Sequence, residues 1–349
     1  MPSPPARARS RRVARVAVFF GGRSGEHEVS CVSAVSTLAA LASAGHEVVA
    51  VGIDRDGEFH LADPTATPLV AEGPTLQLEV PGGRLLGHGR PVEVDVAFPV
   101  LHGPFGEDGT IQGLFEMAGL AYVGSGVLGS AIAMDKDVAK RLCREAGLPI
   151  GKYLVVRGGE FQTAPGDTAG RVGSDLGYPV FVKPANLGSS VGISRAEDEA
   201  SLKDSIYAAL DHDRKVLVEA EVKGREIEVA VLEGPRASVP GEIIVKGGWY
   251  TYDAKYRDDA TRIEVPANLS PAATATVRDL ACRAFTVLEC AGLARVDFFY
   301  EEGGRGFILN EVNTMPGFTS RSMFPMMWAA SGMPYAELCD ELVSLALAR

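Results

Sequence analysis

The chain has 349 residues, 46% of them apolar, and is therefore long enough for two or three domains with separate cores. Its formal net charge of -11 argues against a nucleic-acid binder, because neutralising phosphates requires a basic face. No stretch approaches the roughly 20 apolar residues of a membrane span. We therefore expect a cytoplasmic protein. The five cysteines form no CxxC pair, so neither a zinc site nor a disulfide framework is expected.

A parallel α/β domain is expected first. Residues 1–12 are expected to be a disordered tail, because the apolar run after them is too short for a signal peptide. From residue 13 to residue 126, strand-like runs alternate with helix-like runs, which is typical of a parallel sheet covered by helices. The expected strands are residues 13–20, 46–54, 95–103 and 121–124, and the expected helices are residues 29–45 and 110–119.

Two smaller α+β domains are expected to follow, over residues 127–214 and 215–349. The first begins with a helix that Gly147 and Pro149 end, and then has short strands around one further helix. The second has strands, a helix and a hairpin. In chain order we expect a helix at 134–147, strands at 152–156, 179–184 and 191–195, a helix at 198–212, strands at 215–222 and 226–232, a helix at 271–292 and a hairpin at 295–313.

A polar stretch rich in glycine and aromatic residues, 246–262, interrupts the last domain. A loop of this length inside a compact domain is more often a functional lid than an accident. A disordered surface loop is the alternative.

The hairpin carries the strongest chemical signal. If its turn centres on Gly304, antiparallel pairing sets Asp297 opposite Glu311 and Arg295 opposite Asn313, and all four side chains share one face. Carboxylate and amide oxygens without histidine or cysteine suit a hard cation such as Mg²⁺. The alternative is a solvated polar face, but the neighbouring apolar residues indicate a packed strand, where uncompensated acids are costly.

A glycine- and serine-rich loop follows Lys183 within residues 181–193. Backbone N–H groups and hydroxyls beside a lysine are suited to covering phosphates, and a plain hairpin is the alternative. The chain has no GxxxxGK[ST] motif, which excludes a P-loop. A GxGxxG match at residues 124–129 is weak, because the acid at about the right distance, Glu145, lies in a predicted helix.

The order of motifs resembles that of the D-alanine:D-alanine ligase family. The matching blocks are GGRSGEHEVS, FPVLHGPFGEDGTIQG, GSGVLGSAIAMDK, VKPANLGSSVGIS, EIEVAVL, AKY, RVDFF and LNEVNTMPGFTSRS, which together extend over nearly the whole chain after the tail. The resemblance implies a three-domain α/β (α+β) ATP-grasp fold, in which two α+β domains clasp ATP. It also implies that ATP phosphorylates the carboxylate of one D-alanine, and that the amine of a second D-alanine then displaces phosphate to give D-alanyl-D-alanine for peptidoglycan.

The resemblance assigns ATP and metal contacts residue by residue. Lys136 and Lys183 match phosphate-binding lysines, and Glu226 matches the carboxylate that holds the ribose hydroxyls. Glu219, Ala220 and Val222 fall in the segment that meets the adenine, although the family often carries lysine and an aromatic residue where this chain has Ala220 and Glu221. The implied Mg²⁺ (or Mn²⁺) ligands are Asp297, Glu311 and Asn313.

The same resemblance implies contacts to the substrates. Glu26 would receive the ammonium of the first D-alanine, with His102 near its carboxylate, and Arg295 and the N–H of Gly317 would stabilise the oxyanion. The remaining expected site residues are Ser189 and Tyr256, which link to Glu26 and close the lid, and Lys255 and Ser322, which hold the second substrate. By themselves, Glu26 also fits a first-turn helix acid and His102 a satisfied core histidine.

Three alternatives stay open from the sequence. The Lys255–Tyr256 pair favours a dipeptide over an ester with D-lactate, but an apolar pocket rejects the added hydroxyl of D-serine only by about a hundredfold. Another ATP-grasp ligase would share only the metal and phosphate residues. A non-catalytic nucleotide-binding protein would be expected to lose Arg295 or a metal ligand. The resemblance also implies a homodimer.

Overall fold

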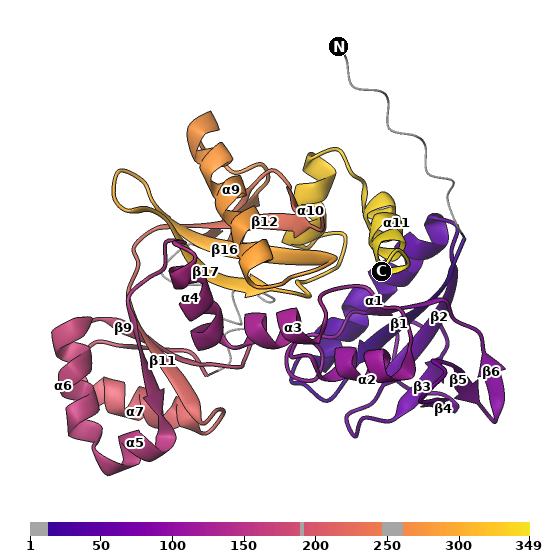
Figure 1. Ribbon diagram of the computed structural model, residues 1–349, viewed down its shortest axis with the longest axis horizontal. Helices are drawn as coiled ribbons and strands as arrows, with labels where there is room; N and C mark the ends of the chain where they lie inside the picture. Colours follow the sequence, from indigo (N-terminus) through magenta and orange to yellow (C-terminus); the bar gives the residue numbers. More distant parts are fainter. Residues whose placement is uncertain (1–12, 189–191, 246–260) are drawn as a thin grey trace.

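The computed structural model describes residues 13–188, 192–245 and 261–349, which form three sheets with helices around them (Figure 1). The N-terminal unit is built on a seven-stranded sheet of order β6-β5-β4-β3-β2-β1-β7. Among the described strands of this sheet, the parallel pairs are β1 with β2 and β1 with β7. The strands are β1 (Arg15–Gly21), β2 (Glu47–Ile53), β3 (Phe59–Ala62), β4 (Thr75–Leu78), β5 (Leu85–Gly87), β6 (Arg90–Val92) and β7 (Val96–Pro99), and the helices are α1 (His27–Ser43) and α2 (Thr110–Ala118).

Strand β1, which lies between β2 and β7, is apolar on both faces because both faces are covered. Val16, Val18 and Phe20 pack into one core, which also receives α1, whereas Ala17 and Phe19 face the opposite core. This alternation follows from the two-residue repeat of a strand.

The parallel part of the sheet agrees with the sequence prediction, but its edge does not. Strands β3 to β6 extend the sheet in antiparallel fashion over a segment where no strand was expected. These strands have three or four residues each, too few to produce a clear alternating pattern. The expected strand at 121–124 is wrong, because only Tyr122 forms an isolated bridge, to Ala97.

The central unit contains a four-stranded antiparallel sheet of order β10-β9-β11-β8. Its strands are β8 (Tyr153–Arg157), β9 (Val180–Pro184), β10 (Ser194–Ala196) and β11 (Lys215–Ala220). Two helices lead into it, α3 (Val127–Met134) and α4 (Lys136–Glu145), and three pack on it, α5 (Gly158–Thr163), α6 (Pro165–Asp175) and α7 (Glu199–Leu210). Strand β11 lies beyond the boundary expected at residue 214, so the strand that follows this boundary still pairs within the central sheet.

The expectation of one covering helix in the central unit is wrong, because α5 and α6 are also present. Helix α6 has the sequence PGDTAGRVGSD, and its three glycines lower the helix propensity. Its buried residues Ala169 and Val172 are held by packing against the sheet. Tertiary packing therefore outweighs local propensity here.

The C-terminal unit contains an antiparallel sheet of order β15-β14-β12-β16-β17, with β13 added to β12. Its strands are β12 (Arg225–Leu232), β13 (Arg236–Ala237), β14 (Gly241–Val245), β15 (Thr261–Glu264), β16 (Leu293–Glu301) and β17 (Gly306–Asn313). Its helices are α9 (Pro271–Val287), α10 (Met323–Ala330) and α11 (Tyr335–Ala346). Most of the expected lid, 246–260, lies outside the described residues, as does the tail, 1–12.

The last helix returns to the N-terminal unit, where it lies beside α1 (Figure 1). His46 Nε2 lies 3.0 Å from Asp340 Oδ1, and the hydroxyls of Thr37 and Tyr335 are 3.3 Å apart. Leu338 and Leu342 share one hydrophobic core with β1. The core on one face of the N-terminal sheet is therefore completed by side chains of α11, near the other end of the chain. Among the described residues, no helix has both the length and the apolar character needed to cross a membrane.

Candidate active site

A cavity of about 300 Å³ lies between the central and C-terminal sheets. It is lined from α4, from β9 and β11 of the central sheet, and from β12, β16 and β17 of the C-terminal sheet. All six expected ATP-site residues line it, namely Lys136, Lys183, Glu219, Ala220, Val222 and Glu226. Of the expected metal ligands, Asp297 and Glu311 line it and Asn313 does not. The structure thus brings most of the residues expected at the nucleotide into one cleft.

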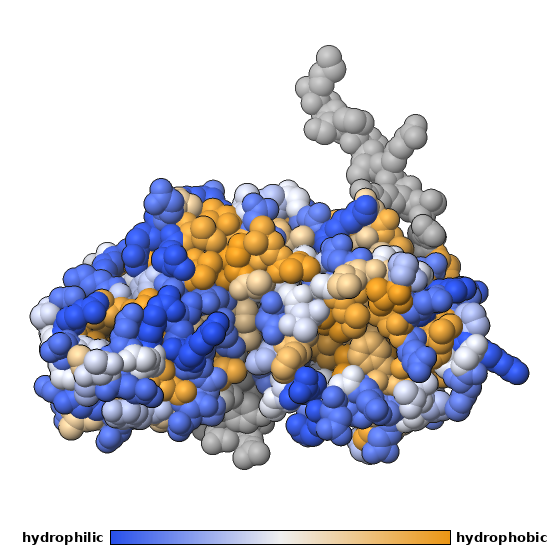
Figure 2. All heavy atoms as spheres, turned by 60° about the horizontal axis from the view of Figure 1, so that its bottom comes forward, coloured by the Kyte–Doolittle hydropathy of each residue, from blue (hydrophilic) through white to orange (hydrophobic). Residues whose placement is uncertain are grey.

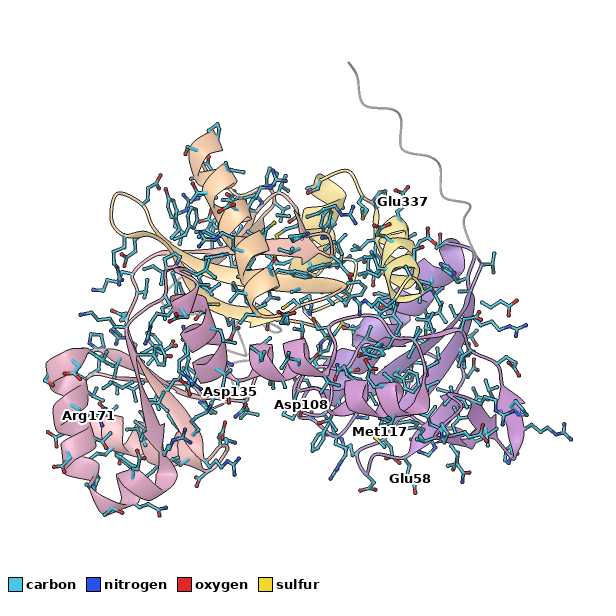
Figure 3. The ribbon with its side chains drawn as sticks, in the orientation of Figure 1. Glu58, Asp108, Met117, Asp135, Arg171 and Glu337 are labelled. Carbon is cyan, nitrogen blue, oxygen red and sulfur yellow. The ribbon has the colours of Figure 1, made fainter. Side chains whose placement is uncertain are left out.

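Helix α4 supplies lysines from its first turns. Asp135 caps the helix by accepting from the N–H groups of Asp137 and Val138, both at 3.1 Å, and lies where the central unit approaches the rest of the molecule (Figure 3). Lys136 Nζ then donates to the Leu187 carbonyl at 2.6 Å and lies 3.6 Å from Glu311 Oε2. Lys140, one turn later, points into the same cavity because helical residues four apart share a face.

A buried ion-pair cluster occupies one wall of the cavity. Glu219 lies 2.7 Å from Lys183 Nζ and 3.1 Å from Lys140 Nζ. Burial opposes ionisation of Glu219, but the two lysines outweigh it and lower its pKa to about 2. Burial likewise opposes the charge on Lys183, yet Glu219 raises its pKa. This cluster therefore keeps its charges, with two cations around one anion.

The β16–β17 hairpin has the expected pairing. Arg295 lies opposite Asn313 and Asp297 opposite Glu311, so that prediction is confirmed. The turn is one residue shorter than a turn centred on Gly304 requires, and a β-bulge at Asn310 restores the register beyond it. The acidic residues consequently share a face of the sheet.

The oxygen-rich face of this hairpin continues onto β12, where Glu228 pairs with Asp297. Arg295 forms two hydrogen bonds of 2.7 Å with the Asp297 carboxylate, and its Nε lies 3.1 Å from Glu228 Oε2. Burial opposes the charge on Arg295, but these carboxylates raise its pKa. Carboxylate and amide oxygens from Asp297, Glu311 and Asn313 form a donor set that fits a hard divalent cation.

The residues expected at the first substrate lie at the carboxyl ends of the parallel strands β1 and β7. Glu26 immediately precedes α1, and a Cβ atom at Gly103 would come within 2.8 Å of its Oε2, so the carboxylate lies directly over Gly103. His102 is buried, and its imidazole contacts Met315 and Ser33. Burial lowers the pKa of His102.

The loop between β17 and α10 carries the last expected site residues. Ser322 begins α10, and its Oγ accepts from the Thr319 N–H at 3.0 Å. A Cβ at Gly317 would approach that hydroxyl to 3.3 Å, which places the two residues side by side. Ser189, Lys255 and Tyr256 lie outside the described residues.

Three residues of the site were missed from the sequence: Lys140, Glu228 and Glu107. The spacing of Lys140, four residues after Lys136 on a predicted helix, was a usable signal. Glu228 could have been placed only with the β12–β16 register, which the sequence does not specify. Glu107 accepts hydrogen bonds from Gly103 and Met315, two residues brought together by the tertiary fold.

Two sheets that enclose a cleft lined by lysines, with an acidic hairpin on its floor, define the ATP-grasp class of ligases. Two family models match the chain, "D-ala D-ala ligase N-terminus" at residues 15–125 and "D-ala D-ala ligase C-terminus" at residues 142–344. The chain belongs to the D-alanine–D-alanine ligase family.

Individual relatives agree with this membership. The chain is 50% identical to a D-alanine–D-alanine ligase of Frankia casuarinae, with 97% of this chain and 98% of the relative covered. It is 48% identical to one of Mycobacterium tuberculosis, with 98% and 97% covered. Among solved structures, the D-alanine-D-alanine ligase of Coxiella burnetii has a TM-score of 0.83 at 32% identity, covering 96% of both chains. The VanG D-Ala:D-Ser ligase of Enterococcus faecalis has a TM-score of 0.84 at 33% identity, covering 96% of this chain and 100% of the other.

Proposed function

We propose that this protein joins two D-alanine molecules into D-alanyl-D-alanine at the expense of ATP, for peptidoglycan precursor synthesis. One observation carries the proposal: lysines from α4 and β9 face the acidic hairpin across a single cleft, and Gly188 of the cleft lining lies close to the Glu26 carboxylate. Such a cleft suits phosphoryl transfer to a carboxylate, because cations can hold the phosphates while the hairpin side chains hold the reacting end.

The reaction has two steps. The γ-phosphoryl group of ATP moves to a carboxylate oxygen of the first D-alanine, and ADP is released from the broken phosphoanhydride bond. The amine of the second D-alanine then attacks the carbonyl carbon of this acyl phosphate, a C–N bond forms, and the C–O bond to phosphate breaks. The amine must lose a proton before or during this attack.

The residues that would hold ATP are those lining the cleft. Lys136 and Lys183 neutralise phosphate oxygens, Glu226 accepts from the ribose hydroxyls, and the Glu219–Val222 segment borders the base. Asp297, Glu311 and Asn313 would bind Mg²⁺ or Mn²⁺, which neutralises phosphate charge when bound. Arg295 lies against Asp297, where a guanidinium can meet the transferred phosphoryl group and the oxyanion.

The remaining roles concern the two amino acids. Glu26 binds the ammonium of the first D-alanine, and the N–H of Gly317 donates to the oxyanion. Ser322 and Lys255 hold the carboxylate of the second D-alanine, while Ser189 and Tyr256 link to Glu26 and close a lid formed by residues 246–262. His102 lies near the carboxylate of the first D-alanine, and its ring nitrogens contact Met315 and Ser33.

D-serine as second substrate is the competing function, and the fold similarity to a D-Ala:D-Ser ligase favours testing it. The higher identity to D-alanine–D-alanine ligases supports D-alanine.

We further propose that the enzyme works as a homodimer in the cytoplasm. Met117 of α2 and Leu128 of α3 are large exposed apolar side chains, which supports a partner surface on this part of the molecule. Figure 2 shows that apolar residues reach the surface on both halves of one face.

The testing experiment supplies purified protein with ATP, Mg²⁺ and equal amounts of D-alanine, D-serine and D-lactate, and identifies products by mass spectrometry while ADP is measured. Predominant D-alanyl-D-alanine with one ADP per dipeptide is expected. A mixed dipeptide or an ester would overturn the assignment of the second substrate, and ATP hydrolysis without a condensation product would overturn the ligase reaction. Asp297→Asn serves as the inactive control.

A further inference from the structure

The backbone of Met315 is held on both sides by side chains of the N-terminal unit. Its N–H donates to Glu107 Oε1 at 3.2 Å, and its carbonyl oxygen accepts from His102 Nδ1 at 3.0 Å. Met315 itself is buried, with 5% of its surface exposed. A residue that contacts another unit through both backbone groups and an enclosed side chain has little freedom to shift.

Met315 lies in a segment that carries two of the proposed active-site residues. Met315 lies two residues after Asn313, which faces Asp297 from the end of β17, and two residues before Gly317, the proposed oxyanion donor. Both neighbours depend on the path of the backbone between them. A donor that is misplaced by a fraction of an ångström loses much of its effect on the transition state.

The hydrogen bonds of His102 also fix which nitrogen carries its proton. A carbonyl oxygen can only accept, so Nδ1 bears the hydrogen, and Nε2 is left as the acceptor for the Ser33 hydroxyl at 3.1 Å. The Ser24 hydroxyl additionally donates to the His102 carbonyl at 2.7 Å. Both ring nitrogens are thus engaged by protein groups, and burial, which lowers the pKa of His102, keeps the ring neutral.

Glu107 completes the same arrangement from the next turn of the loop. Its Oε2 accepts from the Gly103 N–H at 2.7 Å, while Oε1 holds Met315. Gly103 is the residue over which the Glu26 carboxylate lies. A continuous set of contacts therefore joins the proposed ammonium site at Glu26 to the backbone that presents Gly317.

We propose that His102 and Glu107 are positioning residues that clamp Met315, and so fix the segment from Asn313 to Gly317 against the first-substrate pocket. His102 acts through Nδ1 on the protein rather than through Nε2 on the substrate. The inference rests on the proposed function for its catalytic consequence, although the clamp itself is a property of the protein without substrate.

The test uses two amide replacements that imitate different nitrogens of the ring. In His102→Asn the amide stays near the place of Nδ1 and can still donate to Met315, whereas in His102→Gln it lies near the place of Nε2. We expect His102→Asn to keep most of the wild-type kcat. His102→Gln should lose about tenfold in kcat, the equivalent of one neutral hydrogen bond, with the KM for the first D-alanine unchanged.

Hydrogen–deuterium exchange of the peptide covering residues 314–318 gives a second readout, on substrate-free protein. We expect faster exchange than in the wild type for His102→Gln and for Glu107→Ala, and near-wild-type exchange for His102→Asn. The clamp is overturned if His102→Gln is the more active amide variant, if the main effect is on the KM for the first D-alanine, or if exchange does not change. If the variants lose protection but the wild-type protein itself never forms dipeptide, the clamp stands and the proposed function is wrong.

Discussion

The pKa values of two carboxyl groups in the site are shifted in opposite directions by their surroundings. Burial, together with nearby Glu26, raises the pKa of Glu107 to about 8, although hydrogen bonds from Gly103 and Met315 oppose this. Glu219 is also buried, but Lys140 and Lys183 lower its pKa to about 2. The difference lies in the partners: backbone N–H groups do not neutralise a carboxylate, whereas two lysines do.

Replacing Glu107 by glutamine is expected to flatten the dependence of stability on pH. Between its ordinary pKa of 4.5 and about 8, the folded protein holds a proton that the unfolded chain has released. The contribution of Glu107 to the free energy of unfolding is therefore fully present below about pH 4.5 and is lost as the pH rises through about 8. Urea unfolding from about pH 5 to about pH 8 should show a smaller decline in the free energy of unfolding for Glu107→Gln than for the wild type.

A matched control is Glu337→Gln, which removes a carboxylate from the exposed side of α11 (Figure 3). This variant should keep the wild-type decline. An equal decline in Glu107→Gln would show that Glu107 does not hold the extra proton.

Lys140→Met is expected to weaken ATP binding. The change leaves the buried Glu219 with Lys183 as its remaining lysine partner and removes a cation from the cavity. A hydrogen bond from a charged group contributes about 1.5–3 kcal/mol, so loss of the Lys140 cation from the cavity should raise the KM for ATP at least about tenfold. Arg141→Met is the control, because the Arg141 side chain is largely exposed and pairs with Asp137. Similar KM values for both variants would remove Lys140 from the site.

At the scale of single elements, helix α4 connects stability to function. Its cap, Asp135, accepts two backbone N–H groups and is also within 2.6 Å of Lys215 Nζ. Helix α9 begins in a similar way with Ser270, whose Oγ accepts from the Ala273 N–H at 3.2 Å. Only α4, however, carries cavity lysines.

Asp135→Ala and Ser270→Ala are therefore expected to behave alike in stability and differently in ATP binding. Loss of an N-cap costs about 1 kcal/mol, and somewhat more at Asp135 because the buried Lys215 loses a partner. Thermal unfolding should detect both losses. The KM for ATP should rise only in Asp135→Ala, since only this cap orients Lys136 and Lys140. A rise of the same size in Ser270→Ala would mean that ATP binding responds to overall stability.

The elements also show which parts of the fold could be predicted from the sequence. The parallel strands β1, β2 and β7 and the β16–β17 hairpin were predicted, because long apolar runs and alternation reflect burial directly. Helix α6 and strands β3 to β6 were not, since glycines and short lengths leave no pattern. Likewise, Lys136 and Asp297 could be found from their motifs, whereas Glu107 and Glu228 depend on contacts between distant segments.

At the scale of the whole molecule, the hydrophobic cores do not follow the order of the chain. One core joins Val16 and Phe98 of the N-terminal sheet to Phe324 of α10 and Leu342 of α11. The central unit has a core of its own, which contains Phe161, Val182 and Leu202. The exposed ring of Tyr207 lies against Phe161 at the edge of this core, with ring centroids 5.0 Å apart. The first and last parts of the chain should consequently unfold together, and the central unit should be able to open separately.

Phe324→Ala and Phe161→Ala test this division, because both side chains are fully buried and each truncation should cost about 3–5 kcal/mol. Hydrogen exchange followed by mass spectrometry is expected to show faster exchange in β1, β7 and α10 for Phe324→Ala, with β9 and β11 unchanged. Phe161→Ala should accelerate exchange in α6, α7 and β9 while leaving β1 protected. Equal acceleration of β1 by both variants would indicate one cooperative unit instead. Independent opening of the central sheet would allow the cleft to admit ATP without exposing the core that holds the first-substrate pocket.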